Sequence, residues 1–540
     1  MSTPMLTVEN LDRLGIVAGL VDELGLVEYL NEQVGVDPRE RLSVGVVVKA
    51  MILNGLGFVS APLYLFEQFF VGKATAHLLG EDVQAEYLND DRLGRGLDQL
   101  YQAGVSDLFV GLALQARQRF AVDCRSAHLD STSFAVEGEY ALPSEALVAD
   151  APVPIRVTHG YSRDHRPDLK QFVMNLVCWG DGDLPAFLEL ADGNQSDKAR
   201  FADILLAFRQ QWQFEGLYVA DSALYSEANL QALDGLQWLT RVPFTLRAAT
   251  DLVTTLPDVA LQSTELNGYR IASVCHEYGG VQQRWFVVES EARRRADLDK
   301  LGQTIAQATA QGHTQIARLQ RQASACDADA LTALEQLAAR LPWHELTDRQ
   351  VTSKAHYDRP GKPTAETPPT RLTYHPQATL TLKTDKQAQH QQRAGRFILA
   401  TNVLDADALS PSDALQEYKG QQSTERGFRF LKDPLFFASS VFLKSPERIM
   451  ALAFIMALCL LVYNLGQRHL RQALQQADQT LPNQLGKGTQ RPTLRWIFQC
   501  FMAIHAVTLN GVKQVVNLTG ERRHILQFFG APCRKYYLLC

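Results

Sequence analysis

The sequence has no pair of cysteines spaced for a redox motif or a zinc site. None of its eight cysteines forms a C-x-x-C pair, and none lies at zinc-ligand spacing from a histidine. The start of the chain also lacks a basic stretch followed by an apolar segment, so we expect no signal peptide. We therefore expect buried or free thiols in the reducing conditions of the cytoplasm.

Long hydrophobic runs are scarce as well. The longest, residues 449–463, is shorter than the ~20 residues that span a bilayer. It follows Ser445-Pro446-Glu447, which is typical of the first turn of a helix in a soluble protein. We expect a buried core helix here, and no membrane partner.

The composition excludes several classes of protein. Of the 540 residues, 46% are hydrophobic and 21% charged, which excludes collagen-like, disordered and disulfide-scaffold chains. The net charge of −6 argues against a nucleic-acid partner, but the charge is unevenly distributed. It is −7 over residues 1–120, −8 over 121–410 and +9 over 411–540. A mildly acidic body thus ends in a basic tail.

The periodicity of apolar residues changes along the chain. Helical spacing dominates as far as about residue 121, and short β-branched strands alternating with helices follow. Residues 244–395 interrupt that alternation, and FILATNV at 397–403 resumes the pattern of a buried strand. We expect an all-helical N-terminal domain at 1–121, an α/β core at 122–243 and 396–480, an insertion of strands and long helices at 244–395, and a basic helical region at 481–540.

One predicted helix, residues 415–432, carries an unusual polar face. Tyr418, Glu425 and Lys432 are seven residues apart, so each lies within about 20° of the one before it and all three share one face of the helix. Gln421, three residues after Tyr418 and four before Glu425, shares this face. Spacing alone leaves open a solvated surface with an incidental heptad.

Two aspartates occur where buried strands pass or end. Asp130 lies inside a strand otherwise suited to burial, where an unpaired carboxylate is costly. Asp221 follows an apolar run and should emerge at the carboxyl end of a core strand, where α/β sheets commonly place ligands. Each alone could be a capping or turn residue. Together with Glu425 they could hold divalent cations for phosphoryl transfer.

At this point the sequence resembles a known family. Tyr418-x2-Gln421-x3-Glu425-x6-Lys432 resembles the Tyr-x2-Arg-x3-Glu-x6-Lys signature of one large group of bacterial insertion-sequence transposases. HLDSTS around Asp130 and YVADSALYS around Asp221 resemble the two catalytic aspartate segments of that group. The stretches 160–171 and 192–198 and the N-terminal 120 residues are also similar to parts of these enzymes.

The resemblance implies a DDE transposase. Its fold would be an α/β ribonuclease H-like catalytic core with an inserted strand-rich and helical domain, preceded by an all-α domain and followed by a helical C-terminal region. Asp130 would bridge two Mg²⁺ ions, with Asp221 and Glu425 each holding one, and Mn²⁺ could substitute. The enzyme would cleave the inverted repeats at the ends of its element and transfer the 3′-hydroxyl strands to target DNA. Its partners would be double-stranded DNA and a second copy, as a homodimer in a synaptic complex, and its location cytoplasmic and nucleoid-associated.

The resemblance also implies contacts to DNA phosphates. Tyr418 and Lys432 match the phosphate-contacting positions, which suit a phenol donor and a flexible ammonium. Gln421 departs from the signature, because Gln replaces Arg and brings no charge. Arg426 or Arg429 could supply the missing charge.

Other cationic and aromatic groups are less specific. The loop residues Arg163, His165, Arg166 and Lys170 could approach a DNA backbone or form a solvated surface. The run Arg293–Arg295 favours a solvated helix face, and Trp285 and Trp343 favour packing over base stacking. The C-terminal cations suit either DNA ends or subunit contact; they are Arg491, Arg495, Lys513, Arg522, Arg523, Arg534 and Lys535.

Besides a transposase, the sequence leaves three alternatives to weigh. A nuclease of the same fold would cut DNA without strand transfer, and only joined products separate it from a transposase. A domesticated DNA-binding relative would have lost the chemistry, which the three intact acidic positions argue against. A helical scaffold protein would leave the acidic positions without a role.

Overall fold

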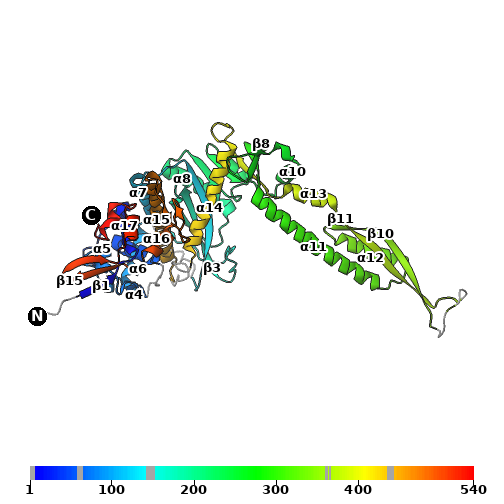
Figure 1. Ribbon diagram of the computed structural model, residues 1–540, viewed down its shortest axis with the longest axis horizontal. Coiled ribbons are helices and arrows are strands. Elements are labelled where there is room, and N and C mark those ends of the chain that lie inside the picture. The colour runs from blue at the N-terminus through cyan, green and yellow to red at the C-terminus, as the bar shows by residue number, and fades with distance from the viewer. Residues whose placement is uncertain are drawn as a thin grey trace.

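The computed structural model describes residues 6–57, 65–140, 153–358, 363, 367–433 and 443–539, without the side chains of residues 197–199 and 422–424. Figure 1 shows a mixed α/β body from which one slender arm projects, with both termini at the opposite end of the body.

Helices from the start of the chain pack against the last segment of the chain. The N-terminal helices are α1 (Leu14–Leu24), α2 (Leu26–Val34), α3 (Val44–Gly55), α4 (Phe66–Phe70), α5 (Thr75–Leu79), α6 (Asp90–Gln102) and α7 (Val105–Arg119), with the 3-10 turn η2 (Ala85–Tyr87). The final segment contains β13 (Leu481–Pro482), β14 (Gly488–Thr489), α16 (Leu494–Cys500), β15 (His505–Leu509), β16 (Val512–Val516), α17 (Gly520–Leu526) and α18 (Ala531–Lys535). Helix α1 contacts α18, so the two ends of the chain form one layer.

Two parts of the chain are less helical than the sequence predicted. The N-terminal region begins with strand β1 (Leu6–Asn10), which pairs with β15 in a three-stranded sheet, β1-β15-β16. The C-terminal region is likewise not purely helical, because β15 and β16 form a hairpin. Its turn, Asn510-Gly511, has positive φ at both residues (50° and 84°), as a type I′ turn requires.

A nine-stranded mixed sheet forms the centre of the body. Its strand order is β4-β3-β2-β5-β6-β12-β9-β8-β7, and β2, β5 and β6 run parallel to one another. The strands are β2 (Ser126–Val136), β3 (Lys170–Trp179), β4 (Leu184–Ala191), β5 (Leu217–Ala220), β6 (Gln237–Arg241), β7 (Gln262–Ser263), β8 (Tyr269–Tyr278), β9 (Val281–Ser290) and β12 (Arg396–Thr401). The helices joined to it are α8 (Asp197–Trp212), α9 (Glu227–Ala232), α10 (Arg247–Thr255), α14 (Pro411–Leu431) and α15 (Pro446–Gln476), with the 3-10 turn η3 (Asp258–Ala260).

Each face of the sheet packs into a different core. Alternating residues such as Leu129, Tyr218 and Trp238 join the large core that also contains the N-terminal helices and α15. The intervening residues, such as Val219 and Leu239, form a smaller core under Ala414 and Leu415 of α14. The period of two along the strands therefore fixes which face α14 covers.

Helix α15 lies at the middle of the large core. It is the one helix in the described part of the chain that is long and apolar enough to span a membrane, but 94% of its apolar window is buried inside the protein. Its neighbours are α1, α3, α6, α7, α14 and α16. These contacts agree with the buried core helix expected from the sequence.

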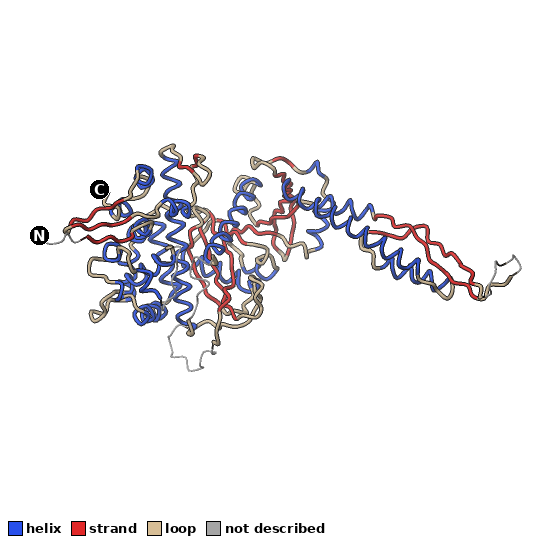
Figure 2. The backbone as a smooth tube through the Cα atoms, turned by 60° about the horizontal axis from the view of Figure 1, so that its bottom comes forward, coloured by secondary structure: helices blue, strands red, loops and turns tan. Residues whose placement is uncertain are grey.

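The arm is built from residues 291–393. Helix α11 (Glu291–Arg321) leaves the sheet directly after β9, and α12 (Asp327–Ala339) and the antiparallel ribbon β10 (His344–His356) and β11 (Arg371–Leu382) pack along it. Its own small core contains Ile316, Leu334 and Leu346. Helix α13 (Thr384–Arg393) returns to the body (Figure 1), and Figure 2 shows the arm projecting from the body in a second view.

The sheet crosses the domain limits expected at 243/244 and 395/396. Strands β7 to β9 come from the expected insertion, yet β9 pairs with β12 of the core. Residues 262–290 thus extend the central sheet, and only the arm projects from it. The division of the chain into independent domains stays a prediction. The seven cysteines in the described part are free, as expected.

The contact between the two ends of the chain can be tested at Gly19 of α1. A Cβ atom there would lie 2.3 Å from Cα of Cys533. We expect Gly19→Ala to lower the free energy of unfolding by about 1–3 kcal/mol in urea denaturation, because backbone must move to make room. Gly302→Ala is the matched control inside α11, where no atom lies within 4 Å, and it should stabilise by roughly 0.5–1 kcal/mol. Equal effects at the two positions would contradict the close packing of α1 on α18.

Candidate active site

Asp130 and Asp221 emerge side by side from neighbouring parallel strands. In the pairing of β2 with β5, Leu129 lies opposite Ala220; Asp130 is the next residue of β2, and Asp221 directly follows the end of β5. Both carboxyls therefore lie on the face of the sheet that α14 covers. Asp130 is buried and Asp221 half-buried.

The two carboxyls disturb each other electrostatically. Burial, and next the nearby charge of Asp221, raise the pKa of Asp130 to about 7. A hydrogen bond of 2.8 Å from the Ser131 N–H to Oδ1 and the charge of Arg163 act in the opposite direction. In Asp221, Oδ1 accepts a hydrogen bond of 2.8 Å from the Ala223 N–H. The raised pKa of Asp130 is thus the electrostatic cost of placing a buried carboxyl beside the charge of Asp221.

Helix α14 is fitted closely to strand β2. The Ser410 side chain caps its first turn and Pro411 occupies that turn. Gly420 lets the helix approach the sheet, because a Cβ there would lie 3.0 Å from Cε1 of His128. The Gln421 Nε2 donates a hydrogen bond of 2.6 Å to the carbonyl oxygen of Leu129, the residue before Asp130.

The expected helix face lies over the aspartates. The charge of Glu425 contributes to the raised pKa of Asp130. Burial raises the pKa of Tyr418 to about 12; the charge of Arg241 opposes this shift, and those of Asp221 and Glu425 reinforce it. Glu425 is itself exposed, whereas Tyr418 packs beside the smaller core. The structure therefore brings the three acidic residues and Tyr418 into one electrostatic neighbourhood.

Lys432, at the end of α14, joins the same site through the 158–171 loop. Its Nζ lies 2.8 Å from Oδ1 of Asp164. Burial lowers the pKa of Lys432, while Asp164 raises it. The adjacent Arg163 donates to Ser131 Oγ at 2.9 Å, and its Nη1 lies 4.0 Å from Asp130 Oδ1. Of the four cations expected in this loop, Arg163 is thus the one that meets the carboxylates, whereas Arg166 pairs with Asp168.

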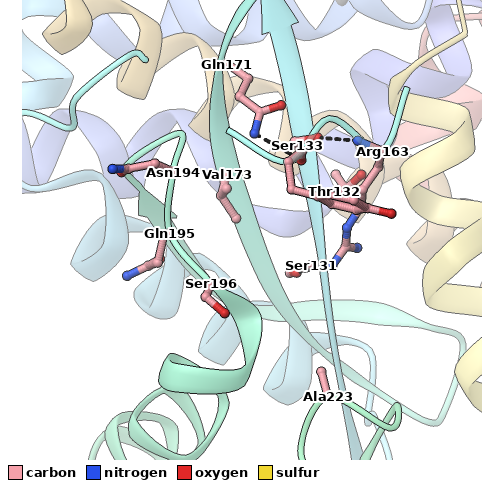
Figure 3. A pocket seen from close by; sticks show the side chains of 11 residues that line it. Ser131, Thr132, Ser133, Arg163, Gln171, Val173, Asn194, Gln195, Ser196 and Ala223 are labelled. Carbon is pink, nitrogen blue, oxygen red and sulfur yellow. Dashed lines mark hydrogen bonds between the residues drawn. The ribbon is translucent and has the colours of Figure 1, made fainter. Parts of the chain in front are cut away.

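Two glycines hold this loop against the turn after β4. A Cβ on Gly160 would lie 2.0 Å from the Gly193 carbonyl oxygen, and Gln171 Nε2 donates to that oxygen at 2.6 Å. Between the loop and the turn is a cavity of about 270 Å³, shown in Figure 3, with hydroxyl and amide side chains around it. Ser131 and Arg163 line it, so the cavity adjoins the aspartates. The two sequence stretches 160–171 and 192–198 are therefore parts of one site.

The other residues expected to contact DNA phosphates, Gln421, Arg426 and Arg429, differ in their exposure. Gln421 is 4% exposed and its Oε1 is also buried, so it links α14 to β2 and has no surface with which to meet a phosphate. The predicted phosphate contact of Gln421 is corrected accordingly. Arg426 and Arg429 are exposed, and Arg426 lies near Arg471 of α15, whose pKa is lowered by burial and by the charges of Arg491 and Arg426. These arginines form a cationic surface beside the carboxylates.

His128 and Glu417 are site neighbours that the sequence did not single out. His128 is buried, and its Nε2 lies 3.2 Å from Ser126 Oγ and 3.7 Å from Glu417 Oε2. Hydrogen bonding to His128 lowers the pKa of Glu417. The sequence does indicate that both residues lie near the site. His128 shares its strand face with Asp130, and Glu417 lies one helical turn before Gln421.

Other aromatic and cationic residues singled out in the sequence make contacts within the protein. Trp285 is buried in the sheet, and Trp343 packs on His390 at the base of the arm. Arg293 and Arg295 form ion pairs within α11. In the C-terminal region, Arg522 donates to the carbonyl oxygens of Cys500 and Met502 and so fastens a turn.

The donor set suits a hard cation, although it is not a closed cage. No group of three or more His, Cys, Asp or Glu among the described residues is arranged to hold a metal ion. Asp130 and Asp221 nevertheless present carboxylate oxygens, the ligands that Mg²⁺ prefers, and their mutual repulsion is the charge imbalance that a divalent cation relieves. The residues therefore fit such an ion, with Glu425 as the third carboxylate of the neighbourhood.

Comparisons with known proteins give limited matches. A family described as a domain of unknown function, DUF4277, matches residues 6–114. No curated protein matches the chain. Among solved structures, piggyBac transposase in a synaptic complex with hairpin DNA matches at 10% identity and a TM-score of 0.36, over 99% of this chain and 84% of that chain. Mos1 transposase in a paired-end complex with the left transposon end matches at 13% identity and a TM-score of 0.15, over 38% of this chain and 60% of that chain. TM-scores in this range do not establish a common fold.

The raised pKa of Asp130 predicts a pH-dependent stability in metal-free buffer. Because the folded state binds this proton more tightly than the unfolded state, the stabilisation is complete below pH about 4 and is lost as the pH rises to about 7. We expect Asp130→Asn, which stays neutral, to be more stable than the wild type at pH 8 by on the order of a few kcal/mol, with the gap closing towards pH 4. Urea unfolding in EDTA from pH 4 to 8 measures this gap. The exposed Asp203→Asn is the control and should follow the wild type; a constant gap for Asp130→Asn would contradict the assignment.

The burial of Gln421 predicts the effect of restoring the signature arginine. We expect Gln421→Arg to lower the free energy of unfolding by roughly 2–4 kcal/mol, because a longer, charged side chain must fit where the buried Gln421 amide packs against the carbonyl oxygen of Leu129. The salt dependence of DNA affinity should not change. Gln416→Arg, at an exposed position of the same helix, is the control that adds equal charge. A Gln421→Arg protein as stable as this control, with a salt slope steeper by about 0.9, would restore the phosphate contact.

Proposed function

We propose that this protein is a DDE-type DNA transposase. It would bind the inverted repeats of an insertion sequence, cleave the element's ends and join their 3′-hydroxyl strands to target DNA. The observation that carries the proposal is the pair of adjacent strand carboxylates, Asp130 and Asp221, covered by a helix that brings Glu425 to them. Three separate sequence segments thus contribute acidic residues to one electrostatic neighbourhood, in the order that the signature requires.

The strand arrangement around the aspartates supports a ribonuclease H-like core. Strands β4, β3 and β2 are antiparallel neighbours, and β5 and β6 then continue parallel to β2. The two aspartates lie on the central parallel pair, with helices on both faces of the sheet. We propose that these five strands with α8, α14 and α15 form the catalytic core.

In the proposed enzyme Asp130, Asp221 and Glu425 would hold Mg²⁺, with Mn²⁺ as a substitute. When bound, the ions would supply charge neutralisation and activate the attacking and leaving oxygens of phosphoryl transfer. Water attacks the phosphorus at the element's end, the P–O bond to the 3′-oxygen breaks, and a 3′-hydroxyl is released. That hydroxyl then attacks a target phosphodiester, and one P–O bond is exchanged for another.

The chain's own cations would orient the DNA strand over the carboxylates. Lys432 and Arg163 lie on one side of the pair, and Lys432 would exchange its contact with Asp164 for a phosphate. Arg426 of α14 and Arg471 of α15 lie near each other and would contact the backbone further along. Tyr418 would stay protonated at neutral pH, because its pKa is raised to about 12, and could donate a hydrogen bond.

The triad can be tested with three isosteric variants. We expect Asp130→Asn, Asp221→Asn and Glu425→Gln each to lower Mg²⁺-dependent cleavage of end DNA by about 10³-fold or more, with folding and end binding retained. The DNA is a duplex carrying the short inverted repeats that flank the reading frame. Glu227→Gln, exposed and close to Asp221 in the chain, is the control and should cleave normally. Full cleavage by any of the three variants would remove that residue from the site.

The products separate a transposase from its two alternatives. End DNA covalently joined to a target plasmid identifies strand transfer, whereas cut but unjoined ends identify a nuclease. Binding without either product in Mg²⁺ or Mn²⁺ identifies a catalytically silent DNA-binding protein. We also propose that a second copy binds the other end in a synaptic complex in the cytoplasm.

A further inference from the structure

The outer half of the arm carries its cations on one face of the β10–β11 ribbon. Partners in register share a face, and successive residues alternate between faces. The face of interest is made by three registered pairs: Thr352 with His375, Lys354 with Thr373, and His356 with Arg371. The pairs between them, Ser353 with Tyr374 and Ala355 with Leu372, are uncharged. The ribbon is therefore cationic on one side and neutral on the other.

This face continues onto the end of α11. His375 Nδ1 donates a hydrogen bond of 3.0 Å to the carbonyl oxygen of Gln320, which joins the ribbon to the last turn of the helix. Arg318 and Arg321 are the cations of that turn. We call the exposed side chains of Arg318, Arg321, Lys354 and Arg371 the arm patch.

The arm patch is not neutralised from within the described part of the chain. None of its four cations forms an ion pair with a described carboxylate. Asp358 is the single described carboxylate between residues 349 and 375. The patch is thus a positive surface at the far end of a projecting arm, in a stretch of chain whose overall charge is −8 over residues 121–410.

We propose that the arm patch binds the backbone of double-stranded DNA. A two-stranded β-ribbon fits the major groove, which is about 12 Å wide, and cations along its face would meet the phosphates at the groove edge. The uncharged face of the ribbon and the exposed side chain of Thr352 would add uncharged contacts with the DNA. The proposal adds a second DNA contact to the proposed transposase, and its test does not depend on cleavage.

The length of the arm fixes where this contact falls. Helix α11 has 31 residues and begins directly after β9, so it spans about 46 Å. At 3.4 Å per base pair this is roughly 14 base pairs, which exceeds one turn of the duplex. The ribbon would therefore grip DNA more than a turn away from the base of the arm.

The test compares salt slopes of DNA binding in EDTA, where no cleavage occurs. The full-length patch variant carries Arg318→Ala, Arg321→Ala, Lys354→Ala and Arg371→Ala. The charge-matched control carries Arg247→Ala, Arg293→Ala, Arg295→Ala and Arg340→Ala, all exposed positions outside the patch. Affinity for 40-base-pair duplexes is measured between 50 mM and 200 mM salt, on the element's end and on an unrelated sequence.

We expect the patch variant to reduce the magnitude of the salt slope by about 3 to 4, one phosphate contact for each cation, and the control to change it little. Loss on both duplexes identifies contact to any DNA, and loss on the end duplex alone identifies the element's end as the bound DNA. A second variant, with Arg318→Lys, Arg321→Lys and Arg371→Lys, keeps the charge and should keep the slope, which separates lost charge from damaged folding. Equal slopes for the patch variant and the control would overturn the proposal.

Discussion

The repulsion between two carboxylates on adjacent parallel strands is the constraint on which the candidate active site depends. The strand register leaves Asp130 and Asp221 no freedom to separate, because each directly follows a residue paired in the sheet. Burial then makes the charge of Asp130 costly, and the Ser131 N–H and Arg163 offset it only in part. An arrangement of this kind is unfavourable for stability alone, which is why it points to a function that supplies positive charge from outside.

Helix α14 connects the packing of the hydrophobic core to the candidate active site. Gly420 and Gln421 fit it against β2, and Gly427 lets its other side approach Leu460 of α15, where an added Cβ would lie 3.0 Å from the leucine. Helix α15 is in turn enclosed by the N-terminal helices and the C-terminal segment. The position of Glu425 therefore depends on packing that extends through the whole body, and remote variants such as those at α1 can reach the site through α15.

The sequence predicted helices and strands well where one pattern of apolar and polar residues continues along a whole segment. The helix at 446–476 and the strand at 396–401 follow directly from their apolar patterns, and the helix at 291–321 from its polar, Ala- and Gln-rich composition. The β15–β16 hairpin was missed although Asn510-Gly511 between alternating residues signals it, because the basic residues around it suggested helices. Other features depend on contacts that no local pattern contains. Gln421 is buried against Leu129, 292 residues earlier, and β9 joins the core sheet through β12. The neighbouring positions of Asp130 and Asp221 could be expected because each belongs to a recognisable strand segment, whereas the burial of Gln421 against Leu129 could not.

The opposite charges of the two ends of the chain serve first to hold the protein together. Arg448 of the basic C-terminal part pairs with Asp98 of α6, and Lys535 pairs with Asp22 of α1. Arg468 pairs with Asp181 in the turn that joins β3 to β4. Since these cations are neutralised internally, the basic tail is a poorer measure of DNA binding than its net charge suggests. The cations available to bind DNA are therefore expected where no ion pair with a described carboxylate neutralises them, which is beside α14 and at the end of the arm. A chain of net charge −6 can then be compatible with a nucleic-acid partner, because the phosphate backbone responds to the local arrangement of cations rather than to the total.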